Sequence, residues 1–356
     1  MSNALANGLA GAGGGIIAQI ITYPLQTVIT RQQTERSKKK DKPVKGTSTI
    51  VQLLQVIENE GLRGLYSGFT PSLVGTATSQ GVYYYFYQIF KNRAEKIAAT
   101  KKTKGYGDGS LGMFSWLIVA ALAGSLNVLL TNPIWVLVTR MQTQSQAAMK
   151  IDEGKKLLLM DETSKENSEW QTLEADIPSH SKGKAAPYGT MEAVQDVYKE
   201  AGVFGFWKGL VPTLIMVCNP SIQFMIYETS LKHLNSRRQK RSLVSEKASA
   251  MEVFLLGALA KMGATVSTYP LLVVKSRLQA KQVIGGSSSL RYSGTIDAIY
   301  KIIRHEGWSS FYKGMSAKIV QSVFSAAVLF MIKEELVKMF LLFSSKGTRL
   351  RLKNTP

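Results

Sequence analysis

A short pattern of residues occurs three times along this chain, and it constrains the possible folds more than any other feature. In each copy an Arg stands seven residues, and a Gln nine residues, after a Pro. Downstream of each copy lies a second phrase, in which Glu and Gly are followed by an aromatic residue two positions before another Gly. Repeats on this scale indicate an architecture of three similar modules. The copies are Pro24, Arg31, Gln33, Glu60 and Gly68; Pro133, Arg140, Gln142, Glu200 and Gly209; and Pro270, Arg277, Gln279, Glu306 and Gly314.

The spacing of the two phrases defines the modules. From the Pro to the last Gly there are 44 residues in the first and third copies and 76 in the second. The middle copy therefore carries an insertion, near residues 145–187, which is rich in Lys, Glu, Ser and Asp. Such a composition predicts a flexible polar loop. We predict three repeats at 1–100, 105–240 and 248–345 within one body.

Apolar stretches alternate with charged connections along the chain. Each stretch is long enough for a bilayer, which takes roughly 20 residues per helical crossing. Each also contains polar residues, which in a membrane should face a cavity or another helix. We therefore predict an all-α membrane protein with six transmembrane helices around a wet cavity. The stretches lie at about 4–30, 71–90, 111–138, 210–231, 250–274 and 316–332.

The chain is strongly basic, with a formal net charge of +20. Basic loops on anionic lipid explain much of this charge, and a cavity that attracts anions is compatible with it. A nucleic-acid partner is not expected, because the basic residues flank apolar helices instead of forming one soluble face. The single Cys218 excludes an internal disulfide framework. We find neither metal-ligand spacing nor a nucleophile with a base, and predict that the protein is not an enzyme and has no cofactor.

The connections and the prolines predict local structure. A Pro inside a helix removes one hydrogen bond and bends the axis, so the first helix of each module should be kinked at Pro24, Pro133 or Pro270. After each Pro phrase comes a segment whose apolar residues follow helical spacing and which should lie along the membrane surface. These segments are Ile50–Glu58, Met191–Tyr198 and Thr295–Arg304.

These features together resemble the mitochondrial carrier family of solute transporters. The three Pro phrases, the three Glu-Gly phrases and the six apolar stretches cover nearly the whole chain. The resemblance implies a barrel of six helices with threefold pseudo-symmetry and one central site. It also implies exchange of solutes by opening alternately to either side of the membrane. We expect a monomer.

The chain departs from the family pattern at the inner gate. In the family, acidic and basic residues at fixed positions after the Pro form a ring of salt bridges, and we call these positions the acidic and basic slots. The resemblance places Gln26, Trp135 and Leu272 in the acidic slots. Of the basic slots, Lys275 alone holds a charge. We predict a cation–π contact between Lys275 and Trp135, worth about 0.5–2 kcal/mol, and a gate that opens easily. The gate also includes Gln33, Gln142 and Gln279.

The outer gate of the family is implied to be partly ionic here. Tyr87 is followed by Gln88 and Lys91, so the base is kept and the acid is lost. Glu228 is kept, and its base is shifted to Lys232. The third copy is irregular around Glu334.

The Trp at position 135 narrows the resemblance. A Trp in this slot is typical of the branch whose members carry folate or FAD, pyrimidine nucleotides, NAD and peroxisomal nucleotides. This branch implies import of NAD in exchange for AMP or ADP, in the peroxisomal membrane. CoA, FAD, ATP or a pyrimidine nucleotide is the alternative substrate, and the mitochondrial inner membrane is the alternative location.

The resemblance also implies where the substrate binds. The family's contact residues stand seven residues after the Gly that opens each even helix, which gives Gly75, Met216 with its neighbour Ile215, and Gln321. Gln80 also belongs to this set. A small, an apolar and an amide residue suit a nucleobase or nicotinamide ring. Alternatively, these are ordinary helix-packing positions.

Charged residues near the Pro phrases are candidates for phosphate. Lys261 stands nine residues before Pro270, about 13 Å along a helix, so it should lie within the membrane and could hold a pyrophosphate. Alternatively, its side chain extends to the membrane surface. The Arg residues of the three phrases could meet phosphate as bidentate donors, but we expect them first to tie their helices to Glu60, Glu200 and Glu306.

Other function classes remain open. A proton leak or a lipid-handling membrane protein is compatible with neutral gates, but three intact Pro phrases favour alternating access. A membrane-bound NAD enzyme would need a soluble catalytic domain, and the insertion near 145–187 is too polar to form one.

Overall fold

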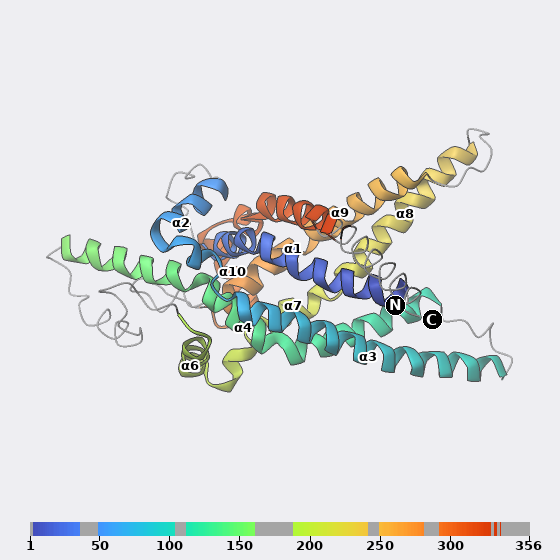
Figure 1. Cartoon of the computed structure of the whole chain (residues 1–356), viewed down its shortest axis with the longest axis horizontal. Coiled ribbons are helices and arrows are strands. Elements are labelled where there is room, and N and C mark those ends of the chain that lie inside the picture. The colour runs from blue at the N-terminus through green and yellow to red at the C-terminus, as the bar shows by residue number, and fades with distance from the viewer. Residues whose placement is uncertain are drawn as a thin grey trace, which may run out of the picture. The chain divides into compact units, whose positions relative to one another are not determined.

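The computed structural model describes residues 3–35, 49–103, 112–160, 188–240, 249–280, 292–328, 331–332 and 335. Helices form all the regular secondary structure of these residues, and no strand occurs among them, so the expected all-α class is confirmed (Figure 1). Glu334 and most of the predicted insertion lie outside the described residues. The elements are α1 (Asn3–Thr34), α2 (Thr49–Leu65), α3 (Phe69–Thr103), α4 (Met113–Met160), α6 (Thr190–Ala201), η1 (Val203–Trp207), α7 (Leu210–Met216), α8 (Asn219–Lys240), α9 (Ala250–Gln279), α10 (Thr295–His305) and η3 (Trp308–Tyr312), followed by a helix at 315–328.

The chain divides into two compact units. The first contains residues 1–32, 45–66 and 314–356. Within it, α2 packs its apolar stripe on α1 through a small core of Val28, Val56 and Leu65. The hydroxyl of Thr27 donates to the Leu65 carbonyl at 2.8 Å and fixes the end of α2 to α1.

The second unit contains residues 33–44 and 67–313. Within it, α3 lies beside α4 and α8 lies beside α9 (Figure 1). Small residues allow these close approaches: a Cβ on Gly75 of α3 would lie 3.0 Å from the Ile134 side chain of α4, and one on Gly263 of α9 would lie 3.0 Å from Ile226 of α8. The helix α10 packs on α9 through a separate apolar cluster.

The three amphipathic segments form helices, as predicted. They are α2, α6 and α10. A Gly with positive φ interrupts α2 near its end and follows α6 and α10 within two residues. Seven residues later a second Gly with positive φ opens the next helix. Glycine adopts this left-handed region without the steric cost of a Cβ, so the repeat is present in the backbone as well as in the sequence. The two sets are Gly61, Gly202 and Gly307, with φ of 70°, 59° and 88°, and Gly68, Gly209 and Gly314, with φ of 75°, 73° and 76°.

The prediction for the insertion near 145–187 was wrong in its first part. Residues 145–160 continue α4 as helix. This stretch contains Ala, Met, Leu, Lys and Glu, which are good helix formers, and the preceding helix supplies the first turn that an isolated helix must otherwise form at a cost.

Two segments of the described residues are long and apolar enough to cross a membrane. They are Met113–Gln144 in α4 and Val203–Ser236, which includes α7 and α8. The other predicted crossings stay predictions.

Candidate functional site

Three buried ion pairs repeat in the structure at equivalent positions. In each copy the Arg that stands seven residues after the Pro pairs with the Glu of the second phrase, as the sequence analysis expected. The Arg side chains are at most 4% exposed. The ties hold the end of each Pro-containing helix to the short helix that follows it. The pairs are Arg31 with Glu60 at 2.6 Å, Arg140 with Glu200, and Arg277 with Glu306.

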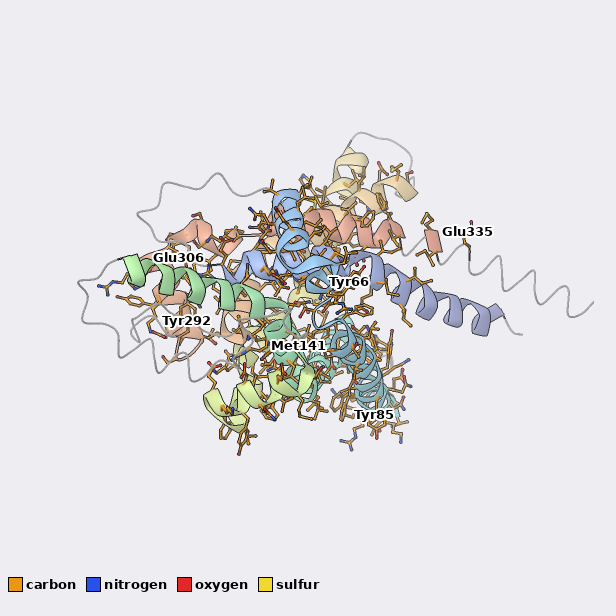
Figure 2. The ribbon with its side chains drawn as sticks, turned by 60° about the vertical axis from the view of Figure 1, so that its left-hand side comes forward. Tyr66, Tyr85, Met141, Tyr292, Glu306 and Glu335 are labelled. Atoms are coloured by element: carbon orange, nitrogen blue, oxygen red, sulfur yellow. The ribbon has the colours of Figure 1, made fainter. Side chains whose placement is uncertain are left out.

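Each of the two pairs in the second unit has further partners. Glu200 also accepts from Lys208 at 2.7 Å. Burial alone would raise the pKa of Glu200, but the charges of Arg140 and Lys208 outweigh it and hold that pKa below its usual range. Arg277 donates through Nη1 to the Tyr292 hydroxyl at 3.5 Å; Tyr292 and Glu306 are labelled in Figure 2. These surroundings leave neither charge of a pair buried without a partner.

The same arginines connect one copy of the pattern to another. Arg140 donates through Nε to the carbonyl of Gln279 at 2.9 Å, and Arg277 donates through Nε to the carbonyl of Gln33 at 3.0 Å. In both cases the acceptor is the last residue of a neighbouring Pro phrase. A guanidinium fits this double task because its donors point in fixed, diverging directions.

The Gln side chains of the pattern continue this network. Gln33 donates to the Tyr269 hydroxyl at 3.1 Å and accepts from Ser276 at 2.9 Å. Gln279 donates to the Asn132 side chain at 3.4 Å and accepts from Thr139 at 3.2 Å. The two sets are equivalent: each Gln reaches the residue before a Pro and the residue before an Arg in another copy. Such neutral bonds join the helix ends where the family places its ionic ring.

The second phrase also repairs a defect created by the Pro. A Pro has no N–H, so the carbonyl four residues before it loses its helical partner. The Trp207 indole donates to the Leu129 carbonyl, four residues before Pro133, at 2.9 Å. Tyr66, labelled in Figure 2, donates to the Ile20 carbonyl in the same way at 3.2 Å. In these two copies the contact therefore links the aromatic residue to the Pro.

The slots of the inner gate hold different contacts from those expected. The indole N–H of Trp135 donates to the Ser79 hydroxyl on α3 at 3.3 Å. Within the described residues, no cation–π contact joins Lys275 to Trp135. Gln26 is half-buried in α1, and its carbonyl accepts from Thr30 at 2.9 Å. The predicted pairing of Lys275 with Trp135 is therefore not present in this conformation, because the indole is turned toward α3. Gln142 is buried, at 2% exposure.

The expected substrate residues lie in both units. Gly75 is buried where α3 meets α4: a Cβ there would lie 3.0 Å from Ile134 and 3.7 Å from Trp135. This tight contact favours helix packing for Gly75 over stacking with a ring. Gln80 and Lys261 are exposed. Ile215 and Met216 lie at the end of α7, half of the Ile215 side chain being exposed.

Gln321 has a partner that the sequence analysis missed. It lies in the helix at 315–328 and is 7% exposed. Its Oε1 accepts from Lys318 Nζ at 2.8 Å. A Lys three residues before a candidate contact residue, inside an apolar stretch, was the signal that could have revealed this pair.

The residues of the outer gate make contacts along their own helices and with α4. Lys91 lies 3.8 Å from Glu95 and 5.5 Å from the centre of the Trp116 ring. Glu228 and Lys232 pair at 3.4 Å, and Gln88 donates to Asn92 at 3.1 Å. The described part of the chain contains no group of three or more His, Cys, Asp or Glu residues arranged for a metal ion.

Comparison with known proteins matches three separate ranges of this chain to one family model. A family model described as "Mitochondrial carrier protein" matches residues 1–97, 170–238 and 246–344. The peroxisomal nicotinamide adenine dinucleotide carrier of Arabidopsis thaliana is 59% identical over 98% of this chain and 99% of that protein. The chloroplastic folate transporter 1 of the same plant is 30% identical over 94% of both chains. Peroxisomal membrane protein PMP34 of Mus musculus is 30% identical over 93% of this chain and 92% of that protein.

Proposed function

This chain belongs to the mitochondrial carrier family, and we propose that it imports NAD across the peroxisomal membrane in exchange for AMP or ADP. One observation carries the substrate: a peroxisomal NAD carrier is 59% identical to this chain over nearly the full length of both. At such identity and coverage, a change of substrate class would have to come from a few cavity residues. PMP34, a second peroxisomal membrane protein, supports the location.

The transport mechanism is alternating access in a six-helix barrel with threefold pseudo-symmetry, kinked at Pro24, Pro133 and Pro270. The repeated ion pairs support it, because each ties a Pro-containing helix to its own short helix in the same way. A module held together in this manner can move as a rigid body. Carriers built from repeats commonly alternate by such movements around a fixed central site.

The inner gate of this carrier is mostly neutral, with Lys275 as the one charged residue in its slots. The ionic slots are mostly lost, and the Gln33 and Gln279 hydrogen bonds take their place between copies. The net contribution of one hydrogen bond to stability is about 0.5–1.5 kcal/mol. Several such bonds together can hold the gate closed and still break when substrate binds. A gate of this kind does not depend on ionic strength, in contrast to exposed ion pairs.

A second candidate within transport is a CoA, FAD, ATP or pyrimidine nucleotide carrier. The similarity to a folate transporter supports this second candidate, because the alignment with that relative covers 94% of this chain, against 98% for the NAD carrier. Its substrate, too, combines a heteroaromatic ring with negative charge. The two candidates share the fold and the gates and differ in cavity contacts alone.

The test is counter-exchange in liposomes with the purified full chain. Vesicles loaded with AMP are offered labelled NAD outside, and vesicles loaded with buffer are the control. The proposal requires uptake that depends on internal AMP and is blocked by excess unlabelled NAD. If CoA, FAD or a pyrimidine nucleotide exchanges and NAD does not, the second candidate replaces the first.

A further inference from the structure

The helix at 315–328 has two faces of different character. Val320, Val323 and Phe324 are exposed to 62%, 66% and 44%. Gln321 and Val328 lie on an adjacent face and are each 7% exposed. In a membrane, the exposed apolar face suits lipid and the protected face suits the protein interior. Gln321 therefore belongs to the protected face of this helix.

Lys318 lies on the protected face, one turn from Gln321. Its ammonium donates to Gln321 Oε1 at 2.8 Å. A Lys has three donors and no acceptor, so it can bond to the oxygen of an amide and never to its nitrogen. The contact thus fixes the orientation of the Gln321 amide, with the NH₂ group directed away from Lys318. The pair presents donors and a positive charge, a combination that matches an oxyanion.

This arrangement occurs in one copy of the repeat. Lys318 stands four residues after Gly314, and the equivalent residues are Ser72 and Thr213. The Thr213 hydroxyl donates to the Gly209 carbonyl of its own helix at 2.7 Å, and Ser72 is fully buried. The third copy alone therefore places a cation at this level. A charge within the membrane is costly and marks a substrate pathway more often than a structural position.

We infer that Lys318 and Gln321 form the subsite for the phosphate groups of the transported nucleotide, with Lys318 as the charged donor and as the residue that orients Gln321. The ligand class rests on the proposed function, whereas the site itself rests on the Lys318–Gln321 contact. Lys261, which the sequence analysis considered for this role, has an exposed side chain on α9. A pyrophosphate has oxygens for both donors, so the two residues can bind it together.

Thermal unfolding of the full chain in lipid-free detergent tests the site, with sodium pyrophosphate as the probe. The unfolding midpoint of the wild type should rise as pyrophosphate is added. Lys318→Met should require roughly tenfold more pyrophosphate for the same shift, as expected when a charged donor is removed. Lys318→Arg should respond nearly as the wild type does. Lys199→Met, which removes an exposed charge on α6, is the matched control and should not differ from the wild type.

A second variant separates binding from folding. Gln321→Glu keeps a partner for Lys318, so the midpoint without ligand should not fall, but its negative charge should abolish the response to pyrophosphate. The inference is overturned if Lys318→Met and Gln321→Glu respond as the wild type does, or if the wild type does not respond. It is also overturned if stabilisation requires phosphatidylglycerol instead of pyrophosphate, because the ligand would then be a lipid headgroup.

Liposome exchange keeps the two proposals distinguishable. In wild-type vesicles AMP should compete with labelled NAD better than adenosine does, and Lys318→Met should reduce that advantage by roughly tenfold while leaving competition by adenosine unchanged. Equal losses for both competitors would indicate a structural role and overturn the inference. If the wild type fails to exchange NAD but shows the pyrophosphate response, the proposed function fails and the subsite stands.

Discussion

Loss of the charge on Glu306 should destabilise this protein more than loss of any exposed carboxylate. Arg277 and Glu306 are 1% and 5% exposed, and one of their two contacts measures 3.0 Å. At that distance two unit charges attract by about 5–6 kcal/mol for an effective dielectric constant of about 20. Glu306→Gln would leave the guanidinium buried without a counter-charge. Arg277 would keep its bonds to the carbonyls of Gln33 and Glu35, so we expect a loss of about 3 kcal/mol, the low end for a broken buried pair.

The assay is denaturant or thermal unfolding of the purified variant in detergent, followed by tryptophan fluorescence. Glu95→Gln is the matched control, because the Lys91–Glu95 pair is 32% and 49% exposed and 3.8 Å long; such pairs contribute about 0–1 kcal/mol. The double variant Arg277→Gln with Glu306→Gln should recover about 1–3 kcal/mol relative to the sum of the single losses. The reasoning is refuted if Glu306→Gln costs no more than Glu95→Gln.

Three further predictions concern the repeated contacts. Trp207→Phe should lower the free energy of unfolding by about 1–3 kcal/mol, because the Leu129 carbonyl loses its donor. Tyr312→Phe is the control, since among the described residues the Tyr312 hydroxyl has no hydrogen bond. Equal unfolding midpoints for the two variants would contradict the capping role. The pKa of Glu200 is lowered on folding. The stability that its charge contributes should therefore be complete above the ordinary Glu range near pH 4.5 and should disappear as the pH falls through the lowered pKa. Glu200→Gln should make the free energy of unfolding less dependent on pH between about pH 6 and 3. Gln33→Leu should weaken the inner gate, because it removes the hydrogen bonds of Gln33 to Tyr269 and Ser276. The expected result is faster efflux of labelled AMP from vesicles without external substrate. Unchanged efflux would count against a gating role.

Local features of the fold could be predicted from the sequence because their causes are local. The apolar periodicity of α2, α6 and α10 is encoded within a few turns and does not depend on distant contacts. The left-handed turns at Gly68, Gly209 and Gly314 follow from the properties of glycine. Even the tie between Arg and Glu could be expected, because two repeated phrases imply a repeated contact. The helix at 145–160 was missed because a polar composition was given more weight than helix propensity.

The contacts at the gates could not be predicted in this way. The partners Gln33 and Ser276 are separated by 243 positions in the sequence, and Trp135 meets Ser79 instead of Lys275 because of how α4 lies against α3. Side chains at these positions have several chemically suitable partners, so the choice depends on packing. Lys318 was overlooked for a different reason: it stands three residues before Gln321 in the same helix, and this local spacing was not considered.

By itself, the sequence determined the threefold repeat, the helical class and the family, since each depends on residue types at fixed spacings. Which donor reaches which acceptor was decided by the tertiary structure alone. Tyr66 and Trp207 reach carbonyls left open by a Pro. The equivalent Tyr312 stacks on Tyr269 much as Tyr66 stacks on Tyr23, yet its hydroxyl makes no such hydrogen bond among the described residues. The physical reason is that a hydrogen bond requires a distance within a few tenths of an ångström and a favourable angle, and the spacing of residues along a chain does not specify either.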